Sequence, residues 1–155
     1  FYDPAKVSHV WGLEPSAGMR RKAQPSIATS PAPVELIDLP GEEIPLEDNA
    51  VDTVVLTYTL CSIPGAVQAL EGMRRVLKPG GKLLFSEHGR APDEAVLTWQ
   101  TRIEPFWKVI GGGCHLTRDI PDLIRQGGFS IENLSTMYLP NSPKIAGFNY
   151  WGSAT

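Results

Sequence analysis

The stretch RRVLKPGGKLLF, residues 74–85, decides the fold of this chain. Pro79 cannot continue a helix, and it disfavours helical geometry at Lys78. Gly80 and Gly81 can take the positive φ that a sharp reversal needs. The apolar run that follows does not alternate with polar residues, which is typical of a strand covered on both faces. A helix that leads into such a strand through a glycine turn is half of a βαβ unit.

The bulk composition indicates one globular domain over residues 1–155. A length of 155 residues, with 42% hydrophobic and 20% charged residues, is ordinary for a single domain. The net charge of −3 argues against a nucleic-acid partner, which favours basic faces. We predict no membrane span and no signal peptide. The two cysteines, Cys61 and Cys114, are most simply reduced thiols, which predicts a cytoplasmic protein.

Strands and helices alternate along the chain, which predicts an α/β fold with helices on both faces of a mostly parallel sheet. The turn signal at residues 141–143 predicts that the last two strands form an antiparallel pair. Residues 24–33 are predicted to be a connector, and Thr117 is the expected N-cap of the last helix, which ends at residues 127–128. The predicted strands are residues 8–14, 34–39, 51–58, 82–87, 131–139 and 145–153, and the predicted helices are residues 15–23, 66–77, 94–109 and 117–126.

Four stretches carry a family resemblance: VWGLEPSAGM (10–19), EEIPLEDNAVDTVVLTYTLCSI (42–63), RRVLKPGGKLLFSEHG (74–89) and GGGCHLTRDI (111–120). In this order they resemble the class I S-adenosylmethionine (SAM)-dependent methyltransferases, of the type 11 branch with ubiquinone/menaquinone C-methyltransferases and thiol S-methyltransferases. The resemblance implies a Rossmann-like fold and SAM as the cofactor. It also implies methyl transfer to a carbon, sulfur or oxygen atom of a small, apolar molecule.

The resemblance places part of a SAM site in the first stretches. It implies that Glu14 accepts hydrogen bonds from the ribose hydroxyls, a role that suits a carboxylate's lone pairs; the alternative is a solvated acid at a strand end. Met19 is expected to cover the adenine, or else to lie in the core. Gly41 and Glu42 are expected to line the adenine edge, although Pro40 stands where relatives often carry Asp or Asn.

The end of the third predicted strand is expected to meet the methionine part of the cofactor, through Thr57 and Tyr58. Cys61 follows shortly after and is interpreted as a small, buried packing residue. Methyl transfer from a sulfonium needs no enzyme nucleophile, because the sulfonium is already activated and the enzyme mainly aligns the attack.

Two histidines are candidates for deprotonating the acceptor. His88 ends the fourth predicted strand and His115 lies in the fourth stretch, and histidine titrates near neutral pH; the alternative is a structural role. The resemblance also places Arg118 at the substrate, and Trp99 in an amphipathic segment (96–110) over the pocket. Cys114, His115, His88 and Asp119 match no zinc-ligand spacing, so no metal is predicted.

The family's glycine-rich loop, acid-x-Gly-x-Gly-x-Gly, does not occur in these residues. The first residues instead match those after the family's first helix, so the first strand and helix are expected to be missing. We therefore expect this chain alone to be inactive and to bind SAM weakly. A homodimer through exposed strand edges is one expected outcome. The alternative functions are a non-catalytic binding or dimerisation module on the same fold, and a nicotinamide-binding oxidoreductase.

Overall fold

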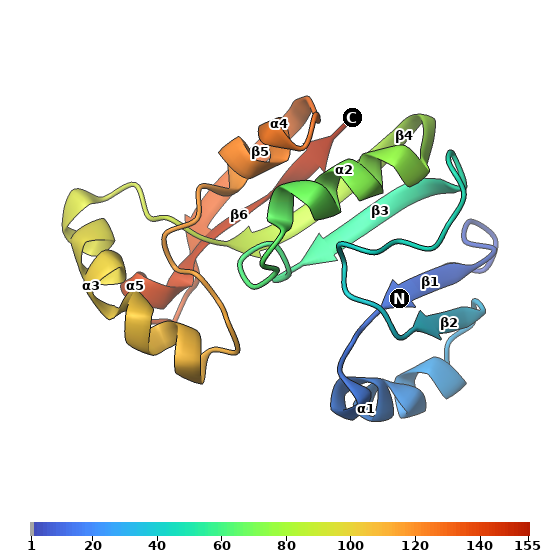
Figure 1. Ribbon diagram of the computed structural model, residues 1–155, viewed down its shortest axis with the longest axis horizontal. Helices are drawn as coiled ribbons and strands as arrows, with labels where there is room; N and C mark the ends of the chain where they lie inside the picture. The colour runs from blue at the N-terminus through green and yellow to red at the C-terminus, as the bar shows by residue number, and fades with distance from the viewer. Residues whose placement is uncertain (1) are drawn as a thin grey trace. The chain divides into compact units, whose positions relative to one another are not determined.

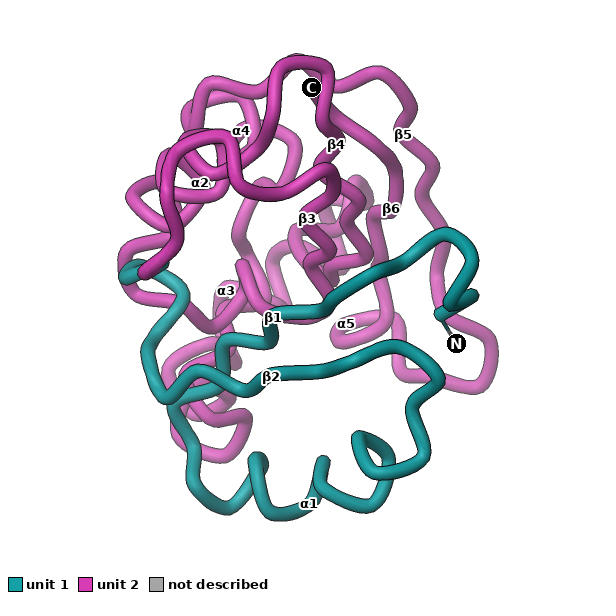
Figure 2. Tube along the Cα trace, turned by 90° about the vertical axis from the view of Figure 1, so that its right-hand side faces the viewer, with its two compact units in different colours: residues 1–44 teal, residues 45–155 magenta. Residues whose placement is uncertain are grey.

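The computed structural model describes residues 2–155, which fold as two compact units (Figure 2). The first unit comprises residues 1–44 and the second comprises residues 45–155. The expectation of one domain over the whole chain stays a prediction. Every helix within the described residues is too short or too polar to cross a lipid bilayer.

The first unit is a small βαβ unit. Strand β1 (Val10–Leu13) leads into helix α1 (Ala17–Ala28), and strand β2 (Val34–Ile37) returns parallel to β1. The hydroxyl of Ser16 caps α1 by accepting the Met19 N–H at 3.3 Å. The prediction that this helix ends near Ala23 was wrong, because it continues past Pro25. A proline removes one backbone hydrogen bond, and the turns on either side of it still form here.

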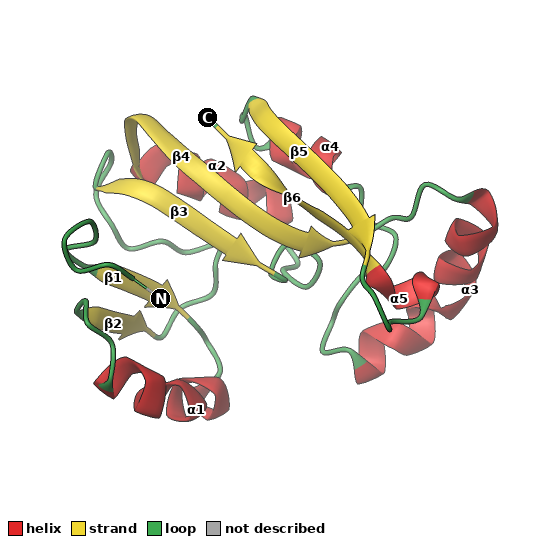
Figure 3. Cartoon of the chain, turned by 180° about the vertical axis from the view of Figure 1, so that it is seen from behind, coloured by secondary structure: helices red, strands yellow, loops and turns green. Residues whose placement is uncertain are grey.

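The second unit is built on a four-stranded sheet in the order β3-β4-β6-β5 (Figures 1 and 3). Strands β3 (Val51–Thr57) and β4 (Leu77–His88) are parallel. Strands β5 (Ile131–Tyr138) and β6 (Phe148–Ala154) are antiparallel, which confirms the predicted closing pair. The sixth predicted strand begins later than expected, because Lys144–Gly147 form a short helix, α5.

One face of this sheet is covered by helices α2 (Ala66–Val76) and α4 (Ile120–Gln126), as Figures 1 and 3 show from opposite sides. Leu83 and Phe85 point to that face and are buried. Leu84, between them, is 41% exposed on the other face. The prediction that this strand is covered on both faces was therefore wrong, because the pleat alternates its side chains and the helices cover one side.

The glycine turn lies inside β4 rather than before it. Leu77 pairs with Val51 and Lys82 pairs with Thr53, so residues 78–81 of β4 stand opposite the single residue Asp52 of β3 and bulge out of the ladder. Gly80 has φ 79°, which confirms the expected positive φ at this residue, whereas Gly81 does not adopt one. Pairing with a distant strand, rather than a local signal, therefore decides where β4 starts.

Helix α4 is capped by Asp119, and the prediction of Thr117 as its N-cap was wrong. The Asp119 carboxylate accepts the Asp122 N–H at 3.1 Å, and Pro121 follows in the first turn, where its missing N–H costs nothing. The Thr117 hydroxyl donates to a carboxylate on another helix instead. The predicted stop is confirmed, since Gly127 caps the helix and Gly128 has φ 86°.

Gly152 should be one of the positions least tolerant of a side chain. It lies in the middle of β6, where a Cβ atom would stand 1.9 Å from the Asn133 carbonyl oxygen and 3.0 Å from the Phe85 ring. We expect Gly152→Ala to lower the free energy of unfolding by about 3 kcal/mol, measured by urea denaturation. Gly18→Ala is the control, since its Cβ would meet only the Ser16 hydroxyl at 3.6 Å and alanine favours a helix. An unchanged denaturation midpoint for Gly152→Ala would contradict this account.

Candidate functional site

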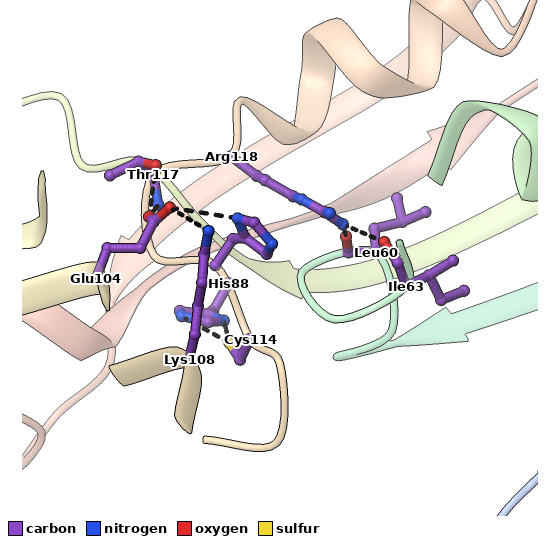
Figure 4. A network of polar contacts seen from close by, with 9 residues as sticks. Leu60, Ile63, His88, Glu104, Lys108, Cys114, Thr117 and Arg118 are labelled. Carbon is purple, nitrogen blue, oxygen red and sulfur yellow. Dashed lines mark hydrogen bonds and ion pairs between the residues drawn. The ribbon is translucent and has the colours of Figure 1, made fainter. Parts of the chain in front are cut away.

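Three segments of the second unit meet at the carboxyl ends of β3 and β4 (Figure 4). They are the loop after β3 (58–63), the last two residues of β4, and the segment after helix α3 (Glu94–Ile110) at residues 111–119. Ligands in open α/β sheets bind at the carboxyl ends of parallel strands. This edge is therefore the candidate site of the second unit.

Hydrogen bonds fasten the segment 111–119 to the loop after β3. The His115 N–H donates to the Cys61 carbonyl at 2.7 Å. The Arg118 guanidinium donates to the Ile63 carbonyl at 2.7 Å and also to the Leu60 carbonyl (Figure 4). Arg118, predicted to contact substrate, thus orders the loop in this structure, and its contact with substrate stays a prediction.

The chain turns sharply at Tyr58, directly after Thr57 ends β3. Tyr58 has φ 51°, a left-handed conformation that is uncommon outside glycine and that clusters at functional sites. Its N–H donates to the Ser86 carbonyl at 3.0 Å, and its hydroxyl pairs with the side-chain oxygen of Asn149 at 2.8 Å. The ring remains half exposed at the strand's end. This position agrees with the predicted place of Tyr58 at the cofactor's methionine end, which itself stays a prediction.

The side chain of Glu87 holds the turn at Tyr58 through hydrogen bonds, a role that the sequence interpretation did not predict. Its side chain is fully buried and accepts the Thr59 N–H at 2.7 Å and the Cys61 N–H at 3.4 Å. Burial raises the pKa of Glu87 to about 7, while these N–H donors act in the opposite direction. In the sequence, the signal for such a role was that Glu87 is an acid at the end of an apolar strand, next to His88.

Cys61, His88 and Cys114 come together beside this turn, each from a different segment and each buried. The Cys114 Sγ lies 3.6 Å from Nδ1 and 3.7 Å from Nε2 of His88 (Figure 4). A hydrogen bond with Cys114, together with burial, raises the pKa of the Cys61 thiol to about 12. The same hydrogen bond lowers the pKa of Cys114 to about 7. The prediction that Cys61 is buried is confirmed, but the sequence did not predict that it lies beside His88 and Cys114.

The carboxylate of Glu104, on α3, holds His115 in place. The Glu104 carboxylate lies 3.2 Å from His115 Nδ1 and 3.6 Å from Lys108 Nζ, and it accepts both the N–H and the hydroxyl of Thr117. Burial alone would raise the pKa of Glu104, but the Thr117 donors, His115 and Lys108 lower it. Burial, Arg118 and Lys108 lower the pKa of His115. The pair presents a neutral imidazole whose orientation is fixed by a carboxylate.

Trp99, the other predicted substrate residue, lies on the outer side of α3. Its side chain is 54% exposed, and the Arg102 guanidinium stands 5.5 Å over its ring. The structure therefore provides the predicted aromatic surface on this helix, and contact with substrate stays a prediction.

The predicted cofactor residues of the first unit lie at and after the carboxyl ends of β1 and β2. Glu14 follows β1 directly, and its carboxylate accepts the Ser16 N–H at 2.8 Å. Met19 in α1 is 52% exposed, which excludes the alternative of a core methionine. Gly41 and Glu42 lie in the loop after β2. Ribose and adenine binding by these residues stay predictions.

Comparisons with known proteins agree on one class of enzyme. A family model described as a methyltransferase domain matches residues 2–85. The thiol S-methyltransferase TMT1B of Rattus norvegicus is 43% identical over 108 residues, which is 66% of this chain and 44% of that protein. The demethylmenaquinone methyltransferase of Bacillus mycoides is 38% identical over 79 residues, or 50% of this chain and 33% of that protein. The chain thus spans less than half the length of these relatives.

Solved structures show the same fold. A SAM-dependent methyltransferase from Methanosarcina mazei aligns with a TM-score of 0.72 at 15% identity, over 94% of this chain and 81% of that one. A putative methyltransferase from Bacillus halodurans aligns with a TM-score of 0.70 at 16% identity, over 97% and 82% of the two chains. The expected Rossmann-like α/β fold is confirmed.

Proposed function

This chain belongs to the methyltransferase domain family, and we propose that it serves methyl transfer from SAM to the sulfur of a small, apolar thiol. The observation that carries the choice of sulfur is the similarity to proteins named thiol S-methyltransferases. The human TMT1B protein of that name is 39% identical over 115 residues, which is 70% of this chain. Bound SAM supplies an activated methyl group on a sulfonium centre.

In this proposal the residues of the first unit bind the cofactor. Glu14 accepts hydrogen bonds from the ribose hydroxyls, because a carboxylate offers several acceptor sites and no competing donor. Gly41 and Glu42 meet the adenine edge, and Met19 covers its face with a polarizable side chain. Thr57 and Tyr58, where β3 ends, are the residues proposed for the methionine part of SAM.

The proton of the acceptor thiol passes to His115. As the acceptor sulfur forms its bond to the methyl carbon, the sulfonium–methyl bond breaks, and the products are a thioether and S-adenosylhomocysteine. Glu104 holds Nδ1 of His115, so the other ring nitrogen is the one that accepts the proton. His88 suits this role less, because it is 6% exposed and both of its nitrogens lie against the Cys114 sulfur.

A methyl-transfer assay with a panel of acceptors tests the proposal. Labelled SAM is offered with alkyl thiols, aryl thiols, quinols and phenols, and we expect transfer to thiols. Preferred transfer to quinol carbon would contradict the thiol assignment and match the demethylmenaquinone methyltransferase relatives instead. The family's glycine-rich loop does not occur in residues 1–155, so the assay uses both the 155-residue chain and the whole product of its gene. Transfer by neither protein would favour the non-catalytic alternative.

His115→Gln should separate proton removal from substrate binding. We expect about 100-fold slower transfer to alkyl thiols, because positioned proton transfer contributes on this scale. Aryl thiols acidic enough to ionise in the assay buffer should react nearly as fast as with the unaltered protein. The His9→Gln variant, altered in the first unit, is the control. An equal loss with both kinds of thiol would contradict a role for His115 as the proton acceptor.

A further inference from the structure

We propose that Cys61, His88 and Cys114 form a Zn²⁺ site with an open fourth position. Each residue offers one ligand atom, and these three atoms all lie within 4.8 Å of one another. Two thiolates and an imidazole are ligands that Zn²⁺ prefers, and a set of three protein ligands is typical of sites that keep one position open. Zinc binding at these residues is independent of methyl transfer.

The spacing of the three ligands is close to that of a tetrahedral zinc centre. Zn–S bonds of about 2.3 Å and Zn–N bonds of about 2.0 Å place a sulfur about 3.5 Å from a nitrogen and two sulfurs about 3.8 Å apart. The Cys114 Sγ already lies 3.6 Å from His88 Nδ1 and 3.7 Å from Nε2. Side-chain movements of about 1 Å, with rotation of the imidazole, bring the set onto one ion.

The main chain around the ligands is fixed before any ion binds. Glu87 accepts the Cys61 N–H, and the Cys61 carbonyl accepts the His115 N–H, next to Cys114. His88 is the last residue of β4 and is therefore held by the sheet. Such prior order lowers the conformational entropy that metal binding must overcome.

Charge balance also favours a divalent ion. Two thiolates with Zn²⁺ and a neutral imidazole form a set with no net charge, which a buried position tolerates. Without the ion, the alternatives for Cys61 and Cys114 are two packed thiols or a disulfide. Both cysteines are free in this structure.

Zinc titration of the reduced 155-residue chain tests the site. Using a chromophoric zinc chelator as competitor, we expect about one tightly bound Zn²⁺ per chain. Co²⁺ in its place should show sulfur-to-metal charge-transfer absorption. Cys61→Ser, Cys114→Ser and His88→Gln should each weaken Zn²⁺ binding by about 100-fold or more, because loss of even an outer-shell partner costs 10–100-fold. His9→Gln is the matched histidine control and should bind Zn²⁺ like the unaltered chain.

One measurement needs no variant, in case a substitution prevents folding. Zn²⁺ should protect both thiols of the unaltered chain from alkylation, and a chelator should remove that protection. Unprotected thiols at saturating Zn²⁺, or binding that survives in a folded His88→Gln protein, would overturn the proposal. So would a Cys61–Cys114 disulfide that persists under reducing conditions and excludes the ion. Loss of methyl transfer with intact zinc binding would count only against the proposed function.

Discussion

Replacing Glu87 with alanine is expected to lower the free energy of unfolding of residues 45–155 by about 3–5 kcal/mol. The buried carboxylate accepts the N–H groups of Thr59 and Cys61. In the described residues neither N–H group has another hydrogen-bond acceptor. Each donor left without a partner costs about 1–3 kcal/mol, and the deleted side chain leaves a cavity in addition. The loop should therefore lose its fixed shape before the sheet does.

Two measurements separate the local effect of Glu87→Ala from the global one. Urea unfolding gives the loss of stability, and amide hydrogen exchange should show faster exchange at Thr59 and Cys61 than at the centre of β4. Glu71→Ala is the control, because Glu71 is exposed on α2 and its loss should change stability by less than about 0.5 kcal/mol. Unchanged exchange at Thr59 in the Glu87→Ala protein would show that the carboxylate does not hold the turn.

The fold was predictable wherever the signal is local. The helix that ends before Pro79, the positive φ of Gly80 and the stop at residues 127–128 all follow from single residues and their immediate neighbours. The start of β4 at Leu77 was not predictable in this way, because it depends on pairing with Val51. Whether Leu84 is covered likewise depends on which helices pack on the sheet, and periodicity along one strand does not contain that information.

The site was predictable as a set of residues but not as an arrangement. His88, His115 and both cysteines stood out by residue type, and the strand ends predicted that a ligand binds at this edge of the sheet. Their pairing depends on hydrogen bonds between distant loops, such as the one from the His115 N–H to the Cys61 carbonyl. Glu104 was not predicted because an acid on an amphipathic helix is ordinarily solvated, and its contacts with His115 and Thr117 depend on how the segment 111–119 docks.

Glu104→Gln is expected to lower the free energy of unfolding by about 2 kcal/mol at neutral pH. The carboxylate accepts two hydrogen bonds from Thr117 and faces His115 and Lys108, and hydrogen bonds to a charged acceptor contribute about 1.5–3 kcal/mol. An amide has a single oxygen and no charge, so it replaces this set only in part. Glu94→Gln, at the exposed start of the same helix, is the control and should have little effect.

The effect of Glu104→Gln should also depend on pH, in a direction fixed by the lowered pKa of Glu104. A carboxyl group whose pKa is lower in the folded than in the unfolded state stabilises the fold above its unfolded pKa of about 4.3. That contribution is lost as the pH falls through the folded-state pKa. Lys108 and His115 both face the carboxylate, and His115 gains its charge as the pH falls, so both favour the ionised carboxylate until it takes up its proton. Urea unfolding from about pH 7 to about pH 3 should therefore show the two proteins converging in acid. A stability difference that stays constant over this range would mean that packing, rather than charge, is what Glu104 contributes.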